Sequence, residues 1–254
     1  MLLGLIFPDS GSIFIRGKRF DNNQRQLLRS IGAIIERPDM YGYLSGWDNL
    51  KIFATLTDRN TTDARLHEVI ELVGLKGREH DRFSAYSQGM KQRLGIAVAM
   101  VNKPDLLILD EPTNGLDPQG IAEIRNLIRS LSRDHGKTIL ISSHLLHEME
   151  LVASSMLVLH RGKKIADGKV TDLLNPSQTL VEFALVEPAS LVKMINASSW
   201  QQAFDHQSSD GLIFKLHPSR IAELNKWLVE QGAQVQGIRS KHSLEDYFLS
   251  ITHD

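Results

Sequence analysis

Two adjacent acidic residues, Asp110 and Glu111, follow a run of four aliphatic residues that begins at Leu106. A continuous apolar run of this length, bounded by turn residues, is typical of a strand buried on both faces of a parallel sheet. Ligands of open α/β sheets bind at the carboxyl ends of the strands, so the two acids are expected where chemistry takes place. One carboxylate can then hold Mg²⁺ while the other activates a water molecule. Taken alone, the pattern also fits an acid that merely caps the next helix.

A second group with possible chemistry, Ser87-Gln88-Gly89, opens a helix expected from Met90 to Val101. Serine is a favoured N-cap, glycine lets a ligand approach the backbone, and a helix N-terminus attracts phosphate. The same residues also fit an ordinary capped helix. That simpler interpretation gives no reason for an acid-terminated strand to follow so soon after the helix.

His144 comes directly after Ser143. The two residues follow a segment, Thr138 to Ser142, that is expected to form a buried strand. The strand would place the imidazole at a carboxyl edge as well. A lone histidine is usually structural or solvated, and the other nine histidines of the chain receive no role.

The order of these motifs resembles the second half of the ATP-binding cassette (ABC) ATPase, the motor subunit of ABC transporters. SQGMKQRL is similar to its signature motif, LLILDE to its Walker B strand, GLDP to its D-loop and SSH to its switch histidine. Four motifs in this order and spacing are specific to the family. The resemblance implies that Asp110 binds Mg²⁺, Glu111 acts as general base and His144 senses the γ-phosphate of ATP. The further nucleotide-binding residues that it implies are Ser87, Gln88, Gly89, Asp117 and Glu36.

Glu36 follows another expected buried strand, Ile31 to Ile35. In the family a glutamine commonly stands at this exit and reaches the metal and the attacking water. The IIERP pattern resembles that of antibiotic-export ATPases of the bacitracin-resistance type, so the glutamate indicates a subfamily. The alternative is that Glu36 is a solvated loop acid.

The resemblance implies an α/β fold of the P-loop NTPase type, with a parallel sheet and a helical subdomain at about residues 45–100. In the family that subdomain docks on the membrane subunit, although a plain helical insertion would show the same pattern. Ser45 and Asp63 are the caps expected for two of its helices. The spacing of apolar residues predicts an amphipathic helix from Pro118 to Ser132.

The ATPase domain is expected to cover residues 1–174, with a hairpin of Ser155–His160 and Lys163–Asp167 before the closing segment Val170–Leu174. Residues 175–254 are predicted to form a small C-terminal α+β accessory domain, whose role in dimer contact, regulation or packing stays open. Its expected elements are Leu180–Leu185, Ala189–Asn196, Leu212–Leu216, Ser219–Gln231, Gln234–Ile238 and Leu244–Ile251.

The composition limits the partners of the chain. Its 254 residues carry 29 Lys and Arg against 30 Asp and Glu, a balance that gives no reason to expect nucleic acid. No cysteine is present, which excludes disulfides and cysteine nucleophiles and fits a cytoplasmic protein. No apolar run approaches the roughly 18 residues of a membrane-spanning helix. Membrane contact is therefore expected to go through a partner.

The phosphate-binding pattern G-x-x-x-x-G-K-[ST], or Walker A, occurs nowhere in the sequence. Gly136-Lys137-Thr138 is not such a loop, because Leu131 stands where the first glycine is needed and the tripeptide precedes a strand instead of following one. In the family the loop comes just before a stretch similar to residues 1–17, with Met1–Ile6 at the end of a helix. We therefore expect an N-terminally truncated cassette, whether from a misassigned start, a truncated gene or a fragment.

We predict the ATP-hydrolysing subunit of an ABC exporter, which works as a head-to-tail homodimer or heterodimer and is coupled to a separate integral-membrane permease. It would lie in the cytoplasm, on the inner face of the cell membrane through that permease. The alternatives are a non-enzymatic remnant and a soluble ABC protein of translation or chromosome maintenance. The short distance from Glu36 to Ser87 leaves no room for the long coiled coils of the chromosome type. The transported substrate stays open, because the membrane subunit selects it.

Overall fold

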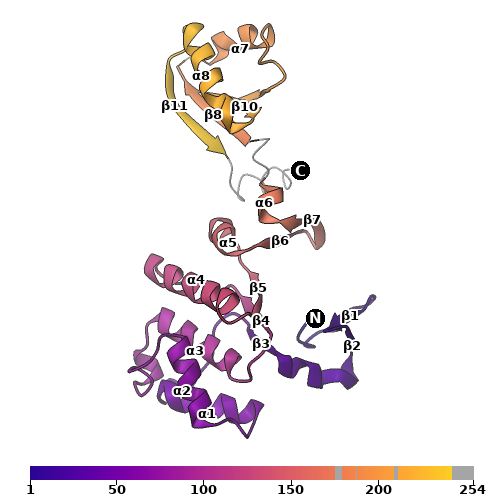
Figure 1. Ribbon diagram of the computed structural model, residues 1–254, viewed down its shortest axis with the longest axis vertical. Helices are drawn as coiled ribbons and strands as arrows, with labels where there is room; N and C mark the ends of the chain where they lie inside the picture. The colour runs from indigo at the N-terminus through magenta and orange to yellow at the C-terminus, as the bar shows by residue number, and fades with distance from the viewer. Residues whose placement is uncertain (175–178, 187, 209–210, 242–254) are drawn as a thin grey trace. The chain divides into compact units, whose positions relative to one another are not determined.

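The computed structural model describes residues 1–174, 179–186, 188–208 and 211–241. The chain forms two compact units, Met1–His144 and Leu145–Asp254, whose elements are shown in Figure 1 and which are described separately. The predicted domain boundary at residue 174 falls within the second unit and stays a prediction. The helix predicted over Leu244–Ile251 lies outside the described residues.

The first unit is built on a parallel sheet of β3 (Ile31–Ile34), β4 (Leu106–Asp110) and β5 (Thr138–Ser142), in the order β3-β4-β5. All three strands lie where the sequence predicts them. The register pairs Asp110 of β4 with Ser142 of β5, so the acidic end of one strand lies beside the polar end of the next.

One face of this sheet is closely packed against helix α3 (Gln88–Met100). A Cβ atom on Gly32 would lie 2.2 Å from the carbonyl oxygen of Ala99, so only glycine allows this approach. Leu107 and Leu109 are fully buried, whereas Leu106, Ile108 and Asp110, which alternate with them in β4, are half-buried. The prediction that β4 is buried on both faces is therefore wrong.

Strand β5 is an edge strand, and none of its residues is buried. Its Leu140 side chain is 47% exposed. The prediction of a buried β5 is wrong because, in the part of the chain that the structure describes, this strand pairs with β4 alone.

Helices α1 (Gly46–Thr57) and α2 (Asp63–Leu72) pack against α3, and the short 3₁₀ helix η2 (Phe83–Ala85) precedes α3 in the chain. The Ser45 hydroxyl accepts from the backbone N–H of Asp48 at 3.0 Å, which is the N-cap bond of the predicted capping box, and the same hydroxyl donates to the Asp48 carboxylate. The cap of α2 is Thr62 instead of the predicted Asp63, because Thr62 keeps an extended backbone and Asp63 already belongs to the helix.

The N-terminal segment Met1–Ile6 consists of turns and bends, so the prediction of a helix end there is wrong. Leu5 and Ile6 are 72% and 65% exposed, and a short helix without a packed apolar face is not stable by itself. The segment leads into the hairpin of β1 (Ile13–Ile15) and β2 (Lys18–Phe20) and then into a 3₁₀ helix, η1 (Asn22–Ser30). The unit also contains α4 (Pro118–Arg133), close to the predicted bounds.

The second unit begins with α5 (Leu146–Val152), the predicted hairpin of β6 (Ser155–His160) and β7 (Lys163–Lys169), and α6 (Val170–Leu173). An antiparallel sheet follows in the order β11-β8-β10-β9. Its strands are β8 (Thr179–Leu185), β9 (Phe204–Gln207), β10 (Gly211–Leu216) and β11 (Val235–Lys241). The helices of the same region are α7 (Ala189–Asn196), the 3₁₀ helix η4 (Pro218–Arg220) and α8 (Ile221–Glu230).

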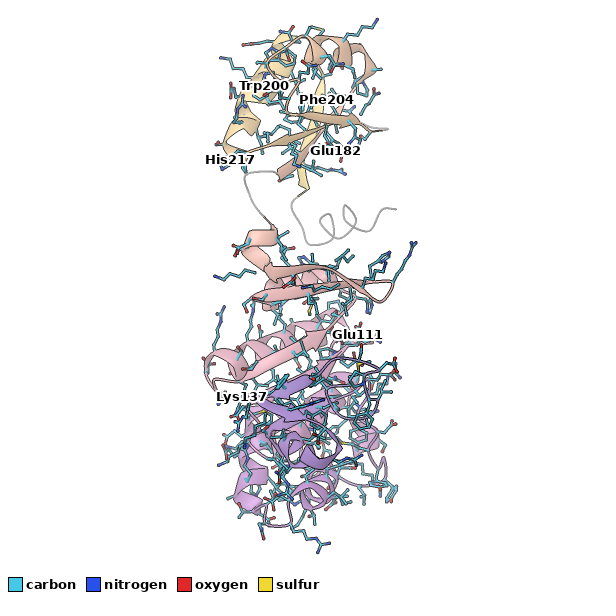
Figure 2. The ribbon with its side chains drawn as sticks, turned by 90° about the vertical axis from the view of Figure 1, so that its right-hand side faces the viewer. Glu111, Lys137, Glu182, Trp200, Phe204 and His217 are labelled. Carbon is cyan, nitrogen blue, oxygen red and sulfur yellow. The ribbon has the colours of Figure 1, made fainter. Side chains whose placement is uncertain are left out.

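The core of this α+β sheet contains Phe183 and Phe214, whose rings meet edge to face with centroids 5.7 Å apart. Trp200 also belongs to this core and is 3% exposed, and the Arg220 guanidinium stacks 4.4 Å from the Trp200 ring centre. Figure 2 labels Trp200 beside Phe204 of β9, the strand that the sequence did not predict. Among the described residues of both units, no helix has the length and apolar character needed to cross a bilayer.

Candidate active site

The two acids lie at the carboxyl end of β4, where the sequence predicts them. Ser142, at the end of β5, donates a hydrogen bond from its hydroxyl to the Asp110 carboxylate. The backbone N–H of Glu111 donates to the hydroxyl and to the carbonyl oxygen of the same serine, at 3.1 and 3.2 Å. The ends of the two strands are thus tied together.

The structure brings Glu111 and His144 into direct contact. Nδ1 of His144 lies 2.8 Å from Oε2 of Glu111, with the histidine side chain 64% exposed and the glutamate 28% exposed. Glu111 has φ of +47°, a left-handed backbone that places it at a sharp turn out of the strand. Figure 2 shows Glu111 and Lys137 at opposite ends of the sheet, so Lys137 is remote from the acids.

The N-termini of α3 and α4 lie side by side. Ser87 caps α3 by accepting from the N–H of Met90 at 3.2 Å, and Asp117 caps α4 by accepting from the N–H of Gly120 at 2.8 Å. A Cβ atom on Gly89 would lie only 3.8 Å from the Cα of Gly120. The residues of the SQG and GLDP motifs therefore share one neighbourhood.

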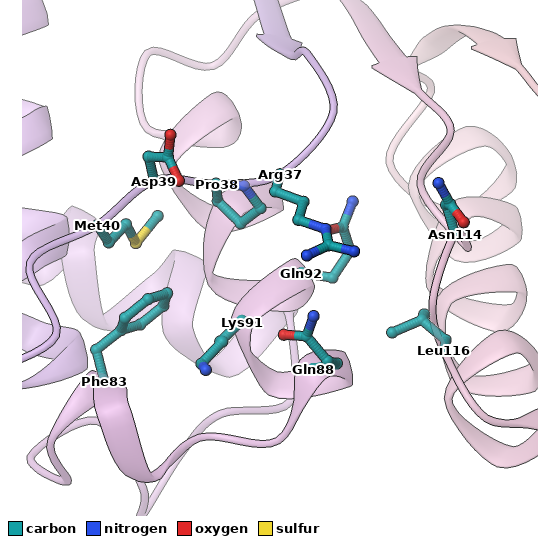
Figure 3. A pocket seen from close by; sticks show the side chains of 10 residues that line it. All are labelled: Arg37, Pro38, Asp39, Met40, Phe83, Gln88, Lys91, Gln92, Asn114 and Leu116. Atoms are coloured by element: carbon teal, nitrogen blue, oxygen red, sulfur yellow. The ribbon is translucent and has the colours of Figure 1, made fainter.

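A cavity of about 260 Å³ lies between the α3 N-terminus, the loop after β3 and the loop before α4. Figure 3 shows Gln88 and Gln92 projecting from one wall and Asn114 from the opposite one. Arg37 extends into the space, and Lys91 lies 5.5 Å from the ring centre of Phe83. Of these residues only Gln88 was predicted as a site residue, because the cavity forms where three separate loops converge.

Glu36 also leaves its strand with a left-handed backbone, φ +57°, and its side chain is exposed. It follows β3 at the same edge of the sheet as Asp110 and Ser142. The hydrogen bond of the Ser87 cap stays on α3, whereas those of Asp110 and Glu111 reach the end of β5. The structure therefore places two separate groups of predicted site residues in this unit.

The donor set at the end of β4 fits a magnesium ion that keeps most of its water. Among the residues that the structure describes, no three carboxylates, histidines or cysteines gather around one point. Mg²⁺ is commonly bound through one or two carboxylates together with water and substrate phosphates, and does not need an all-protein cage. Asp110, only partly buried, provides hard oxygen donors of the right kind.

Residues 1–114 match the family model described as "ABC transporter". The chain is 42% identical to the bacitracin transport ATP-binding protein BcrA of Bacillus licheniformis, over 99% of this chain and 82% of that protein. It is 39% identical to YdbJ of Bacillus subtilis, an uncharacterized ABC transporter ATP-binding protein, over 99% of this chain and 80% of that one. The chain belongs to the ATP-binding subunits of ABC transporters. The predicted family is thus confirmed, while the predicted N-terminal truncation stays a prediction.

Solved structures of ABC ATPases have the same fold. An ATP-binding subunit of an ABC transporter superposes with a TM-score of 0.56 at 29% identity, over 67% of this chain and 72% of that chain. CbiO1 of Clostridium perfringens, titled as part of the transporter complex cbiONQ, superposes with a TM-score of 0.62 at 24% identity, over 78% and 77% of the two chains. The P-loop NTPase fold class is confirmed, and the chain is an ABC-type ATPase by family, a family that binds and hydrolyses ATP.

Proposed function

We propose that this chain is the ATP-hydrolysing subunit of an ABC exporter for peptide antibiotics of the bacitracin type. The observation that carries the chemistry is the contact of Glu111 with His144 at the edge where Asp110 ends β4. The substrate class is proposed from the bacitracin transport proteins that match 99% of the chain.

Asp110 would hold the Mg²⁺ ion that accompanies ATP, and the ion would polarise the terminal phosphate. Glu111 would take a proton from the attacking water, as a carboxylate in hydrogen-bond reach of that water can. His144, which follows the neighbouring strand β5, would contact the γ-phosphate and orient the glutamate. Glu36, at the neighbouring strand end, would reach the metal and the water from the other side.

Ser87, Gln88 and Gly89 would contact the γ-phosphate of ATP held mainly by a second ATPase subunit. The N-terminus of α3 supports this role, because unpaired N–H groups and the helix dipole favour an anion there. Asp117, which caps the neighbouring helix, would stand at the contact between the two subunits. The site would then be complete only in a dimer.

The permease partner and the membrane location also belong to this proposal. Helices α1 and α2 form a separate layer on α3, a position suited to docking on a membrane subunit. We propose no nucleic-acid partner, since the charges of the chain nearly cancel. Through the permease the chain would lie on the cytoplasmic face of the cell membrane.

The decisive experiment measures ATP turnover of the wild type and of Glu111→Gln, both extended upstream to include a phosphate-binding loop, beside Glu230→Gln as a matched control in α8. Loss of the general base should lower turnover by roughly 10²-fold or more while ATP binding persists. Glu230→Gln should behave like the wild type. Equal turnover in wild type and Glu111→Gln would place the base elsewhere, and a folded wild type without turnover would favour the non-enzymatic alternative.

A further inference from the structure

The hydroxyl of Ser142 touches the groups of both acids at once. It donates to the Asp110 carboxylate and accepts from the backbone N–H of Glu111 at 3.1 Å. We propose that Ser142 is a positioning residue for ATP hydrolysis, which orients the Asp110 carboxylate and fixes the backbone from which Glu111 projects. This inference rests on the roles proposed above for those two acids.

The sheet register sets up the contact with Asp110. Asp110 and Ser142 are direct partners across parallel strands β4 and β5, so their side chains leave the sheet on the same face. Oδ1 of the carboxylate accepts the bond from Ser142, so in this proposal Oδ2 would be the oxygen that meets the metal ion. Groups that bond to a metal-binding carboxylate in this way orient it and raise its affinity for the ion.

The contact with Glu111 stabilises a strained backbone conformation at that residue. A glutamate at φ +47° is strained by about 1–3 kcal/mol and persists only where its surroundings fix it. Its N–H is held by the hydroxyl and carbonyl of Ser142, and its carbonyl accepts from the N–H of Asn114 at 3.1 Å. Two residues beyond Ser142, His144 meets the glutamate side chain. One serine thus connects the metal-side acid, the base and the histidine.

The hydrogen bonds of the Ser142 hydroxyl are not imposed by burial of the side chain. Ser142 is exposed, so water could satisfy its hydroxyl if the serine only ended the strand. The hydroxyl instead points toward the two acids. Hydroxyl chemistry at this position, more than strand shape, is therefore the property to test.

The test compares three substitutions in the full chain: Ser142→Ala, Ser142→Thr and Ser142→Val. Threonine keeps the hydroxyl, and valine has the same shape without it. Thr138→Val removes a hydroxyl from the other end of β5 and serves as the control. We expect Ser142→Ala and Ser142→Val to lower kcat by about 10-fold, the usual scale for groups that orient a metal ligand, with KM for ATP nearly unchanged. Ser142→Thr and Thr138→Val should stay near the wild type.

A second readout does not depend on turnover. Electron paramagnetic resonance of Mn²⁺, added with ATP to Glu111→Gln protein, measures the affinity for the ion in the presence and absence of the Ser142 hydroxyl. The Ala and Val variants should bind Mn²⁺ about 10-fold more weakly, and the Thr variant should bind like its parent.

Unchanged Mn²⁺ affinity in Ser142→Val would overturn the proposal, as would equal losses in the Thr and Val variants, which would mark a role in strand shape alone. If Glu111→Gln keeps full turnover, the general-base role fails instead. The Mn²⁺ series still decides whether Ser142 orients Asp110 in that case.

Discussion

The contact between Glu111 and His144 gives the two oxygens of one carboxylate different tasks. Oε2 lies 2.8 Å from Nδ1 of His144, so an N–H on that nitrogen donates to the carboxylate. Oε1 is then left to meet a water molecule. Under the proposed mechanism the histidine would orient the Glu111 carboxylate as well as contact phosphate.

Tyr86, directly before the Ser87 cap, predicts a pH dependence of stability. Burial raises the pKa of Tyr86 to about 12, with the nearby carboxylates of Asp81 and Glu79 adding to the shift. Its hydroxyl donates to the carbonyl of Arg78 at 2.8 Å. Since the fold favours the protonated phenol, this stabilisation is complete below about pH 10, the ordinary tyrosine pKa, and is lost as pH rises through about 12.

Urea denaturation at pH 9 and pH 11 checks this prediction. The free energy of unfolding should fall more steeply in the wild type than in Tyr86→Phe, whose ring cannot ionise. Tyr43, 73% exposed, provides the control, because Tyr43→Phe should follow the wild type. An identical fall in wild type and Tyr86→Phe would contradict the assignment.

The ends of two helices carry the second group of the proposed site. Each has a polar cap that satisfies an N–H of the first turn, Ser87 on α3 and Asp117 on α4. A glycine follows at the point where the helices approach one another, Gly89 against Gly120. The absence of a side chain on both glycines allows the two N-termini to lie close together.

Asp117 allows its cap to be separated from any role of its charge. Asp117→Ala should lower the free energy of unfolding by about 1 kcal/mol, whereas Asp117→Asn should keep stability because asparagine caps equally well. Chemical denaturation measures the stability of both variants, and ATP turnover is compared on the same samples. A stable Asn variant with reduced turnover would assign the carboxylate a role beyond capping. Unchanged stability in the Ala variant would refute the cap itself.

Local sequence patterns predicted many of the helices and strands. Which strand faces are exposed to solvent depends on how the elements pack, which local patterns do not contain. The helix after Asp117 was found because a cap, a proline and a 3.6-residue apolar period agree. The exposure of Leu140 was missed because apolar runs record the preference of a strand and not which elements cover it. β9 was missed because three of its four residues are polar and exposed, which masks any alternation. The Ser142 contacts depend on a parallel register that no local pattern contains.

At the scale of the assembly, the proposed shared site predicts complementation between two inactive variants in a homodimer. Ser87→Ala and Glu111→Gln each damage one half of every site. A mixed dimer unites the two damaged halves in one site and leaves the other intact. With random exchange and independent sites, the mixture should recover roughly a quarter of wild-type turnover, as two-fold symmetry requires.

ATP turnover of the mixed subunits, after exchange has been verified with a labelled chain, tests this arrangement. Ser87→Ala mixed with the double variant Ser87→Ala, Glu111→Gln is the control, since no intact site can form. No recovery in the first mixture would indicate that Ser87 serves the nucleotide of its own chain.

Glu36 and Glu111 have left-handed backbones that reduce the stability of the fold, while their carboxylates are proposed to serve catalysis. Glycine adopts φ values of +57° and +47° without strain, so Glu111→Gly should fold as well as the wild type or be more stable by up to about 1 kcal/mol. The same change would remove the proposed base and its contact with His144. A search for thermostable variants would therefore include positions 36 and 111 among the residues with positive φ, and under the proposed mechanism glycine at position 111 would raise the melting temperature while abolishing turnover. In such a screen, a high melting temperature would not identify a functional ATPase, and variants at these two glutamates would need a separate test of turnover.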